Sequence, residues 1–393
     1  MPTATKILHV ENSTWDVYNF RLPHIRKLQA QGYEVIVVSP IDDYFGYLNE
    51  QHFSRHIPLK YLRAQKKNPL YDLLFLWELI KIYRQERPSL VIHFTIKPNI
   101  YGSIAARLTG TPAISVFTGL GYAFLHSKGF FRFIPWLCKV AFYKLQKLIL
   151  YNEEDLRVMV DKKIIPLKSC AILHGSGVNT NHYRPLLPKA RGKAFTFLFI
   201  GRLLYDKGLA ELVKAIRALQ EMGKDVECWV VGDFTYTNPS AVSKQQLHEW
   251  VRQRYIRYFG ATDDVRQFIR NVDVVVLPAF GGEGVPKVLL ESMSMGKPIL
   301  TTTTPGCKDT VVHGRNGLVV PPKDQGALKE AMLYYVELPG YELAKMGEAS
   351  RELAILKFDD KIITAQYLEI IRSIIQKPDS MVKNRIKTLQ PTL

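Results

Sequence analysis

The sequence predicts an α/β protein with two domains of similar construction. The chain has 393 residues, which exceeds the size that a single hydrophobic core usually serves. Strand-like apolar runs alternate with amphipathic helical segments in both halves, a pattern typical of parallel sheets covered by helices. A stretch rich in Gly, Ser, Asn and Pro separates the two halves. We therefore expect two Rossmann-like domains that face each other across a cleft.

Composition favours a globular protein, with 47% hydrophobic and 23% charged residues. No run approaches the roughly 20 apolar residues of a transmembrane helix, and the first residues lack the apolar region of a signal peptide. The four cysteines show neither a metal-binding spacing nor a disulfide framework, so we expect a reducing cytoplasm.

The net charge of +17 is unevenly distributed along the chain. Residues 1–190 have 25 Lys and Arg against 13 Asp and Glu, whereas residues 191–393 have 28 against 23. A basic first half indicates an anionic partner, which could be nucleic acid, acidic lipid or a phosphorylated substrate. The absence of helix-turn-helix, zinc and RNA-binding signatures argues against nucleic acid.

The chain opens with a strand at Thr5–Ser13, a helix at Phe20–Gly32 and a second strand at Tyr33–Pro40. No GxGxxG follows the first strand, which removes the main support for a nicotinamide-dependent dehydrogenase. Loops that follow strands line the ligand crevice in sheets of this class. Asn19 and Arg21 could therefore face an acceptor, although a helix-capping Asn and a surface Arg explain them equally well.

Two later strands of the first half end in further candidate residues. Leu90–Phe94 precedes Lys97, which lies where a site residue is expected. The strand in Pro112–Phe124 ends at Thr118 and Gly119, where glycine permits close approach of the backbone to a ligand. Simple turn residues are the alternative interpretation.

The segment Gly129–Lys147 predicts a helix with one basic and aromatic face and one apolar face. Such a helix packs on the core or lies on an anionic membrane, and both readings remain open. An earlier basic connector contains a second group of cations. The candidate membrane contacts are Arg63, Lys66, Lys67, Lys128, Arg132, Trp136, Lys139 and Lys147.

Ser169–Pro185 predicts the connection between the domains. Beyond it, Phe195–Leu219 predicts a strand, a loop and a helix, with Arg202 and Lys207 in the loop. An Arg fork and a compact Lys charge suit a diphosphate, unless Asp206 pairs with one of them on the surface. The expected bounds are residues 1–186 for the first domain, 187–357 for the second, 358–376 for a C-terminal helix and 377–393 for a basic tail.

The segment Glu283–Glu291 organises the second half. It follows a strand-like run, Val272–Phe280, and a two-glycine turn, and it leads into a helix predicted at Val285–Met295. Pro286 suits the first helical turn, and the free N–H groups at a helix start suit phosphate. The two carboxylates could bind sugar or ribose hydroxyls on either side of the phosphates. An ordinary strand–turn–helix is the alternative.

Several strings of the sequence resemble retaining glycosyltransferases of family 4, which have the GT-B architecture. The strings are YNFRLP, IKPNIYG, TGLGYAF, NEEDL, GRLLYDKG, EGVPKVLLE and PGCKDTV. The resemblance covers nearly the whole chain, including GSGVN and HYRP in the connection between the domains. It is closest to bacterial members that build lipid-linked glycans for capsule, O-antigen or protein glycosylation.

The resemblance implies roles for individual residues. Glu283 would hold the hydroxyls of the donor sugar, with Arg202 and Lys207 on the leaving diphosphate as the other catalytic residues. Glu291 would hold the ribose of the nucleotide, and backbone N–H groups near the helix start would hold the diphosphate. The implied donor-binding residues are Gly201, Gly284, Val285, Pro286, Lys287, Val288 and Glu291.

The implied reaction moves an N-acetylhexosamine or hexose, with retention, from a nucleotide diphosphate, expected to be UDP. The acceptor would be a polyprenyl-diphosphate-linked saccharide at an anionic membrane, at the cytoplasmic face. Neither a metal nor a cofactor is implied, because protein cations supply the charge. The resemblance also implies a C-terminal helix that returns to the first domain. A nucleotide-sugar epimerase of the same two-domain fold is the alternative enzyme, and a basic nucleic-acid-binding protein is the alternative of another class.

One position departs from the family pattern. Many members have a histidine in the first-domain loop that corresponds to Phe117–Gly121, where it meets the donor sugar. This sequence has Thr118 in that neighbourhood, and the nearby His93, His126 and His174 do not match. The departure indicates a different donor or a different way of holding it.

Overall fold

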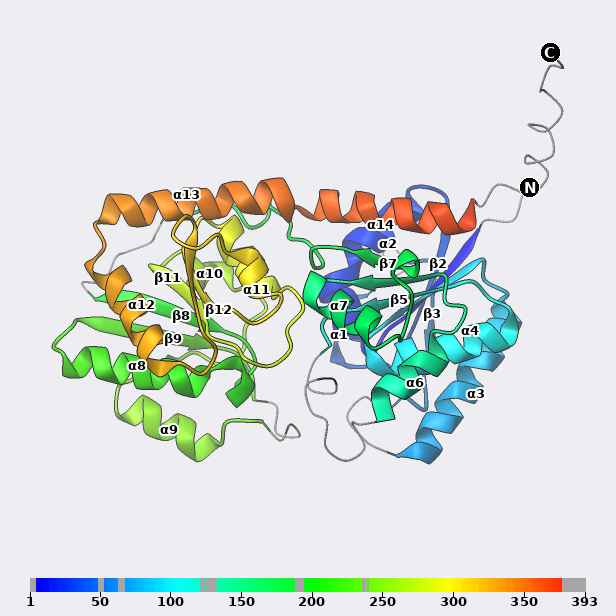
Figure 1. Ribbon diagram of the computed structural model, residues 1–393, viewed down its shortest axis with the longest axis horizontal. Coiled ribbons are helices and arrows are strands. Elements are labelled where there is room, and N and C mark those ends of the chain that lie inside the picture. Colours follow the sequence, from blue (N-terminus) through cyan, green and yellow to red (C-terminus); the bar gives the residue numbers. More distant parts are fainter. Residues whose placement is uncertain are drawn as a thin grey trace, which may run out of the picture.

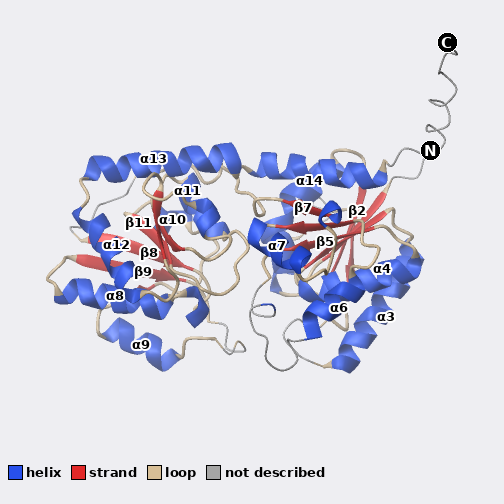
Figure 2. Cartoon of the chain, viewed as in Figure 1, coloured by secondary structure: helices blue, strands red, loops and turns tan. Residues whose placement is uncertain are grey.

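The computed structural model describes residues 5–48, 53–62, 68–120, 124, 133–187, 194–234, 238 and 240–376. Two parallel sheets lie side by side in it, each with helices on both faces (Figures 1 and 2). The expected α/β class with two Rossmann-like domains is therefore confirmed.

Seven strands of the described chain form the first sheet, in the order β3-β2-β1-β4-β5-β6-β7. All neighbouring strands are parallel, so their carboxyl ends meet at one edge, where ligand crevices form. The strands are β1 (Lys6–Val10), β2 (Glu34–Ser39), β3 (Arg55–Pro58), β4 (Leu90–Phe94), β5 (Ala113–Phe117), β6 (Lys147–Leu150) and β7 (Cys170–Ile172). The helical segments are α1 (Thr14–Asp16), η1 (Val17–Arg21), α2 (Leu22–Gln29), η2 (Asp43–Tyr47), α3 (Pro69–Glu86), η3 (Pro98–Gly102), α4 (Ser103–Thr109), α6 (Ile134–Ala141), α7 (Glu153–Asp161) and η5 (Leu167–Ser169).

The second sheet has six described strands in the order β10-β9-β8-β11-β12-β13, again all parallel. They are β8 (Phe195–Ile200), β9 (Val226–Val231), β10 (Arg257–Tyr258), β11 (Val274–Leu277), β12 (Ile299–Thr302) and β13 (Gly317–Val320). The helical segments are η6 (Tyr205–Lys207), α8 (Leu209–Glu221), α9 (Lys244–Arg252), α10 (Arg266–Ile269), α11 (Lys287–Ser294), η7 (Lys308–Thr310), α12 (Gln325–Glu337), α13 (Gly340–Lys357) and α14 (Asp360–Ile375).

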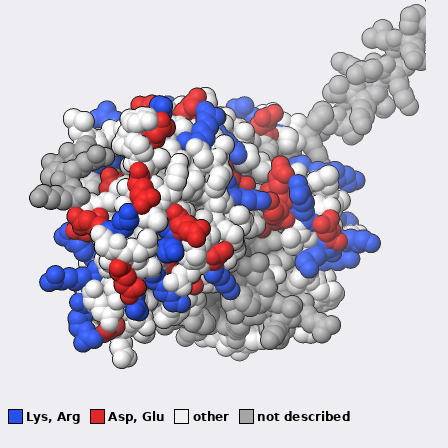
Figure 3. Space-filling view, turned by 60° about the vertical axis from the view of Figure 1, so that its left-hand side comes forward, with Lys and Arg blue, Asp and Glu red and all other residues white. Residues whose placement is uncertain are grey.

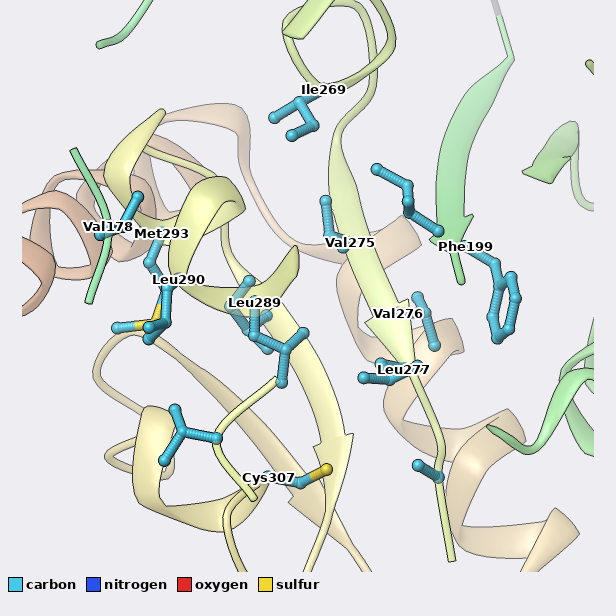
Figure 4. Close-up of a cluster of buried hydrophobic side chains, with 14 of the residues drawn as sticks. Val178, Phe199, Ile269, Val275, Val276, Leu277, Leu289, Leu290, Met293 and Cys307 are labelled. Carbon is cyan, nitrogen blue, oxygen red and sulfur yellow. The ribbon is translucent and has the colours of Figure 1, made fainter. Parts of the chain in front are cut away.

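Helix α11 is fixed to the second sheet by its apolar face. Leu289, Leu290 and Met293 are fully buried and lie in one cluster with the strand residues of β11 (Figure 4). Val178, from the connection between the sheets, belongs to the same cluster. Burial of this face leaves the polar positions at the start of α11 to point away from the core, where a ligand can reach them.

The last two helices join the two domains. Helices α13 and α14 run nearly end to end across both sheets, and α14 packs on α2 of the first domain (Figure 1). His24 of α2 and Thr364 of α14 lie 2.9 Å apart, between Nδ1 and Oγ1. At the crossing, Val178 and Asp360 form a backbone hydrogen bond of 2.9 Å. The expected return of the C-terminal helix to the first domain is confirmed.

The structure corrects two helix predictions. The helix expected through Lys147 is wrong: α6 ends at Ala141, Lys144 takes a left-handed φ of 65°, and Lys147 pairs with Ile114 in strand β6. Helix α11 begins at Lys287, so Pro286 is its N-cap and not part of its first turn.

A strand was also missed. Cys170–Ile172 adds edge strand β7 to the first sheet, within the segment that the sequence assigned to the connection. Its three residues are too few to show an alternating pattern.

Lys and Arg are interspersed with Asp and Glu on the face of the second domain (Figure 3). This distribution agrees with the nearly balanced charge of residues 191–393. None of the helices in the described ranges combines the length and apolar character needed to cross a bilayer.

Candidate active site

The predicted cation loop and the predicted glutamate turn meet at the carboxyl edge of the second sheet. Lys207 Nζ lies 2.5 Å from Glu283 Oε1, and both side chains are about one-fifth exposed or less. The carbonyl of Asp206 accepts hydrogen bonds from the backbone N–H groups of Phe280 and Gly281, at 2.9 and 3.2 Å. The loops after β8 and β11 are therefore tied together, and their charged side chains form one group.

Gly208 permits this approach of the two loops. Its φ is +78°, and a Cβ at this position would lie 2.1 Å from the carbonyl oxygen of Pro278. A side chain would push the loop that contains Lys207 away from the turn that contains Glu283.

Two further charges surround the ion pair. Burial raises the pKa of Asp206, with Glu283 acting in the same direction and Lys207 and Arg202 opposing it. Arg202 is exposed. It is also close enough to the first domain to oppose the rise that burial causes in the pKa of Asp16. Arg202 therefore lies at the cleft between the domains.

Glu291 forms a second polar group on α11. Its carboxylate is nearly buried and lies 3.7 Å from Lys287 Nζ, one turn earlier on the helix. Tyr183, from the connection between the domains, lies close enough to act on the pKa of this carboxylate. Burial raises the pKa of Glu291, against the pull of Lys287 and Tyr183. Tyr183 was not among the predicted site residues, although the HYRP string that contains it was part of the family resemblance.

The first domain covers the glutamate turn with the backbone of Thr118 and Gly119 and with the ring of Tyr151. A Cβ on Gly119 would lie 2.5 Å from the backbone nitrogen of Gly284, and one on Gly284 would lie 2.0 Å from the carbonyl oxygen of Thr118. On the opposite side of the turn, a Cβ on Gly306 would lie 1.2 Å from the carbonyl oxygen of Gly284. Because Gly119, Gly284 and Gly306 have no side chains, the backbones of the three segments that contain them lie in direct contact. The turn with Glu283 is therefore held between the first domain on one side and the Gly306 loop of the second domain on the other. The close approach expected at Gly119 is made to protein backbone.

Side chains also join the domains around the cleft. Lys287 Nζ donates a hydrogen bond to the carbonyl of Asn19 and lies 5.1 Å from the ring centre of Phe20. Lys308 forms an ion pair with Glu154 of α7. The contacts of Lys287 position the start of α11 against the segment that follows β1, and the ion pair of Lys308 joins η7 to α7.

The other first-domain candidates have structural partners. Arg21 is buried: its Nε lies 3.0 Å from Glu11 Oε1, and its guanidinium lies 3.9 Å from the ring centre of Phe94. The structure thus places Arg21 inside the domain. Lys97 lies 2.6 Å from Asp72, and the side chain of Asn19 donates to the carbonyl of Trp15.

The candidate membrane contacts divide into three groups. Arg63, Lys66, Lys67, Lys128 and Arg132 lie outside the described residues. Trp136 and Lys139 are exposed on α6. Lys147 belongs to β6, where its Nζ donates to the carbonyl of Lys168 at 3.1 Å.

Among the residues that the structure describes, no three His, Cys, Asp or Glu side chains gather as a metal site would require. All four cysteines are free thiols in the structure.

Two family models match the chain. Residues 6–152 match the model described as "Glycosyl transferase 4-like", and residues 194–337 match "Glycosyl transferases group 1". The chain is a family 4 glycosyltransferase.

Two similar proteins with assigned activities span two thirds or more of the chain. The N,N'-diacetylbacillosaminyl-diphospho-undecaprenol alpha-1,3-N-acetylgalactosaminyltransferase of Campylobacter jejuni is 26% identical over 92% of this glycosyltransferase and 96% of its own length. The UDP-Gal:alpha-D-GlcNAc-diphosphoundecaprenol alpha-1,3-galactosyltransferase of Escherichia coli is 25% identical over 67% of this chain and 70% of its own.

Solved structures confirm the GT-B architecture. HepE of Anabaena, in complex with UDP and glucose, superimposes with a TM-score of 0.78 at 20% identity, over 94% of this chain and 100% of its own. A glycosyltransferase of Rickettsia africae superimposes with a TM-score of 0.76 at 20% identity, over 95% and 99%. In this fold, the predicted donor residues of the glycosyltransferase lie on the second domain, and Gly284 and Lys287 contact the first.

Proposed function

We propose that this glycosyltransferase moves a hexose or N-acetylhexosamine from UDP to a saccharide on polyprenyl diphosphate, with retention of the anomeric configuration. The observation that carries the proposal is the grouping of Glu283, Lys207 and Arg202 beside the start of α11. A carboxylate for sugar hydroxyls and two cations for a diphosphate lie at one place, under a cover made by the first domain.

The geometry suits the leaving of a diphosphate. As the bond from the anomeric carbon to the β-phosphate oxygen breaks, negative charge develops on the diphosphate. Lys207, Arg202 and the free N–H groups at the start of α11 are already in place for this charge. The acceptor oxygen then bonds to the anomeric carbon on the same face, and its proton passes to the departing diphosphate. Glu291, with Tyr183, is suited to the hydroxyls of a ribose.

Relatives support the choice of substrates. The two named enzymes act on diphospho-undecaprenol-linked sugars and form alpha-1,3 linkages, and the second uses UDP-Gal. The structure of HepE contains UDP with glucose. Because the first of these relatives matches 92% of this chain, we extend the substrate class to it.

A direct test follows nucleotide release from UDP- and GDP-sugars, with and without a prenyl-diphosphate-linked saccharide. A glycosyltransferase releases the nucleotide when the acceptor is present. An epimerase of the same fold changes the sugar without an acceptor, and a nucleic-acid-binding protein shows instead a salt-dependent shift of oligonucleotides.

The proposed acceptor lies in a membrane, and the first domain has a surface suited to one. Between Glu86 and Glu153 the sequence has eight Lys and Arg and no Asp or Glu. Trp136 and Tyr143, at 63% and 64% exposed, lie near the exposed Lys139 and Lys144.

Helices α3, α4 and α6 gather on this side of the domain (Figure 1). The exposed large hydrophobic residues of α3 and α4 are Leu70, Tyr71, Leu73, Trp77 and Leu108. We propose peripheral attachment there to the anionic cytoplasmic leaflet.

Replacing Trp136 by alanine and Lys139 by glutamate should weaken binding to anionic liposomes at least about tenfold. An aromatic anchor is lost, and a favourable cation contribution of about 1 kcal/mol becomes unfavourable. Cosedimentation at low salt measures the change. The matched control is Tyr341→Ala with Lys345→Glu on α13, an exposed ring 5.4 Å from a lysine on the second domain. Equal loss in both variants, or loss in neither, would contradict attachment through α6.

A further inference from the structure

Four aromatic side chains form an exposed cluster on the first domain. Trp15, Tyr18, Tyr44 and Tyr47, which we call the aromatic cluster, have ring centres 5.6 to 6.4 Å apart between neighbours. Trp15, Tyr18 and Tyr47 are 42%, 40% and 60% exposed. Scattered exposed aromatics are ordinary, but a contiguous group on the surface of a folded domain indicates a binding site.

The aromatic cluster lies on two loops that Asp42 ties together. These loops follow β1 and β2, at the carboxyl edge of the first sheet. The Asp42 carboxylate accepts hydrogen bonds from the hydroxyl of Thr14 and from the backbone N–H groups of Trp15 and Tyr44. The rings are thus held in place without a ligand, and such preorganisation lowers the entropic cost of binding.

The aromatic cluster begins beside the donor motif and extends away from it. Phe20 links the cluster to α11. The ring centre of Phe20 lies 5.4 Å from that of Trp15 and 5.1 Å from Lys287 Nζ of α11. The hydroxyl of Tyr44 donates to Asp263 of the second domain at 3.0 Å. A molecule that reacts at Glu283 and extends outward along the first domain would pass over these rings.

We propose that the aromatic cluster binds the saccharide portion of the acceptor, with pyranose rings stacked on Trp15, Tyr18 and Tyr47. The C–H face of a pyranose is apolar and its rim is polar. Tyr and Trp present the same combination, a broad apolar face with a hydroxyl or N–H at the edge. The hydroxyls of Tyr18 and Tyr47 can therefore serve as partners for sugar hydroxyls, whereas that of Tyr44 donates to Asp263. A prenyl chain would use the ring faces alone. The inference rests on the proposed function, because it assumes a saccharide acceptor.

The test measures acceptor KM in detergent, with a fixed short prenyl diphosphate carrying one or three N-acetylgalactosamine residues. The wild type should show a lower KM for the trisaccharide. Trp15→Ala and Tyr47→Ala should each raise that KM about tenfold, as losses of exposed aromatic anchors do, and should remove the advantage of the longer saccharide. Tyr341→Ala, of matched exposure at 64%, should change it less than about twofold. An unchanged UDP-induced rise in Tm shows that each variant is folded.

Two results would overturn the inference. One is a trisaccharide KM equal to that of the wild type in both cluster variants. The other is a rise in KM by the same factor for the one-sugar and three-sugar acceptors, which would leave the advantage of the longer saccharide intact. Saturation-transfer NMR with the lipid-free trisaccharide separates this inference from the proposed function. Binding that Trp15→Ala and Tyr47→Ala abolish supports the cluster even if no sugar is transferred. Binding that they leave intact contradicts it even if transfer is normal.

Discussion

Replacing Glu283 by glutamine is expected to lower kcat about 100-fold or more, the order expected for one preorganised polar contact to the reacting group. Glutamine preserves the size of the side chain but removes its charge and its ion pair with Lys207. The turn is held by backbone contacts with the segments of Gly119 and Gly306, and these contacts do not involve the Glu283 side chain. The fold should therefore tolerate the change, and the Tm should stay near that of the wild type. Steady-state turnover of the nucleotide sugar with saturating acceptor measures the effect.

Glu291→Gln provides the contrast for Glu283. The Glu291 carboxylate lies near Tyr183 and Lys287, one turn into α11, where we expect the ribose to bind. A contact made equally to substrate and transition state changes binding, so donor KM should rise more than kcat falls. Turnover of a folded Glu283→Gln near the wild-type value would reject the role proposed for Glu283, as would an interchange of the two kinetic patterns.

Removal of the Lys207 side chain is expected to have a comparable effect on chemistry. Lys207→Ala takes away a cation that lies 2.5 Å from Glu283, and it leaves Arg202 and the α11 N-terminus to stabilise the leaving diphosphate. We expect kcat to fall about 100-fold, because preorganised charge at a leaving group is among the largest catalytic contributions. Lys214→Ala, an exposed lysine of α8, is the matched control.

The same assay tests whether protein cations suffice for the leaving group. Activity of the wild type should survive EDTA. Loss of activity in EDTA that Mg²⁺ or Mn²⁺ restores would show that a metal supplies this charge, and Lys207 would then have a secondary role.

Local patterns allowed much of the fold to be predicted. Strand β4 has the predicted bounds, Leu90–Phe94, because a fully buried strand of a parallel sheet is a short continuous apolar run. The turn between β11 and α11 was predicted because Pro and Gly mark such turns and because Glu283 and Glu291 match a family pattern. Arg202 and Lys207 were assigned to one loop because they lie between a predicted strand and a predicted helix and match the same family pattern.

Features that depend on distant contacts were not predictable. Gly119 and Gly284 lie far apart in the sequence, so nothing local shows that their backbones stack. Arg21 was expected either to face an acceptor or to lie on the surface, and its burial was missed because its partners, Glu11 and Phe94, follow or end different strands. Lys147 fits the period of a helix, but Lys144 breaks that helix, and pairing with β5 decides the outcome. Tertiary pairing overrides local periodicity at such boundaries.

The most direct test of the proposed function is proton NMR of the product formed from an α-linked UDP-sugar and a prenyl-diphosphate-linked saccharide. The proposal predicts UDP release that depends on the acceptor and a new anomeric signal with the small coupling of an α linkage. A β-linked product would contradict retention. UDP release without an acceptor, with the sugar recovered free or epimerised, would contradict glycosyl transfer itself.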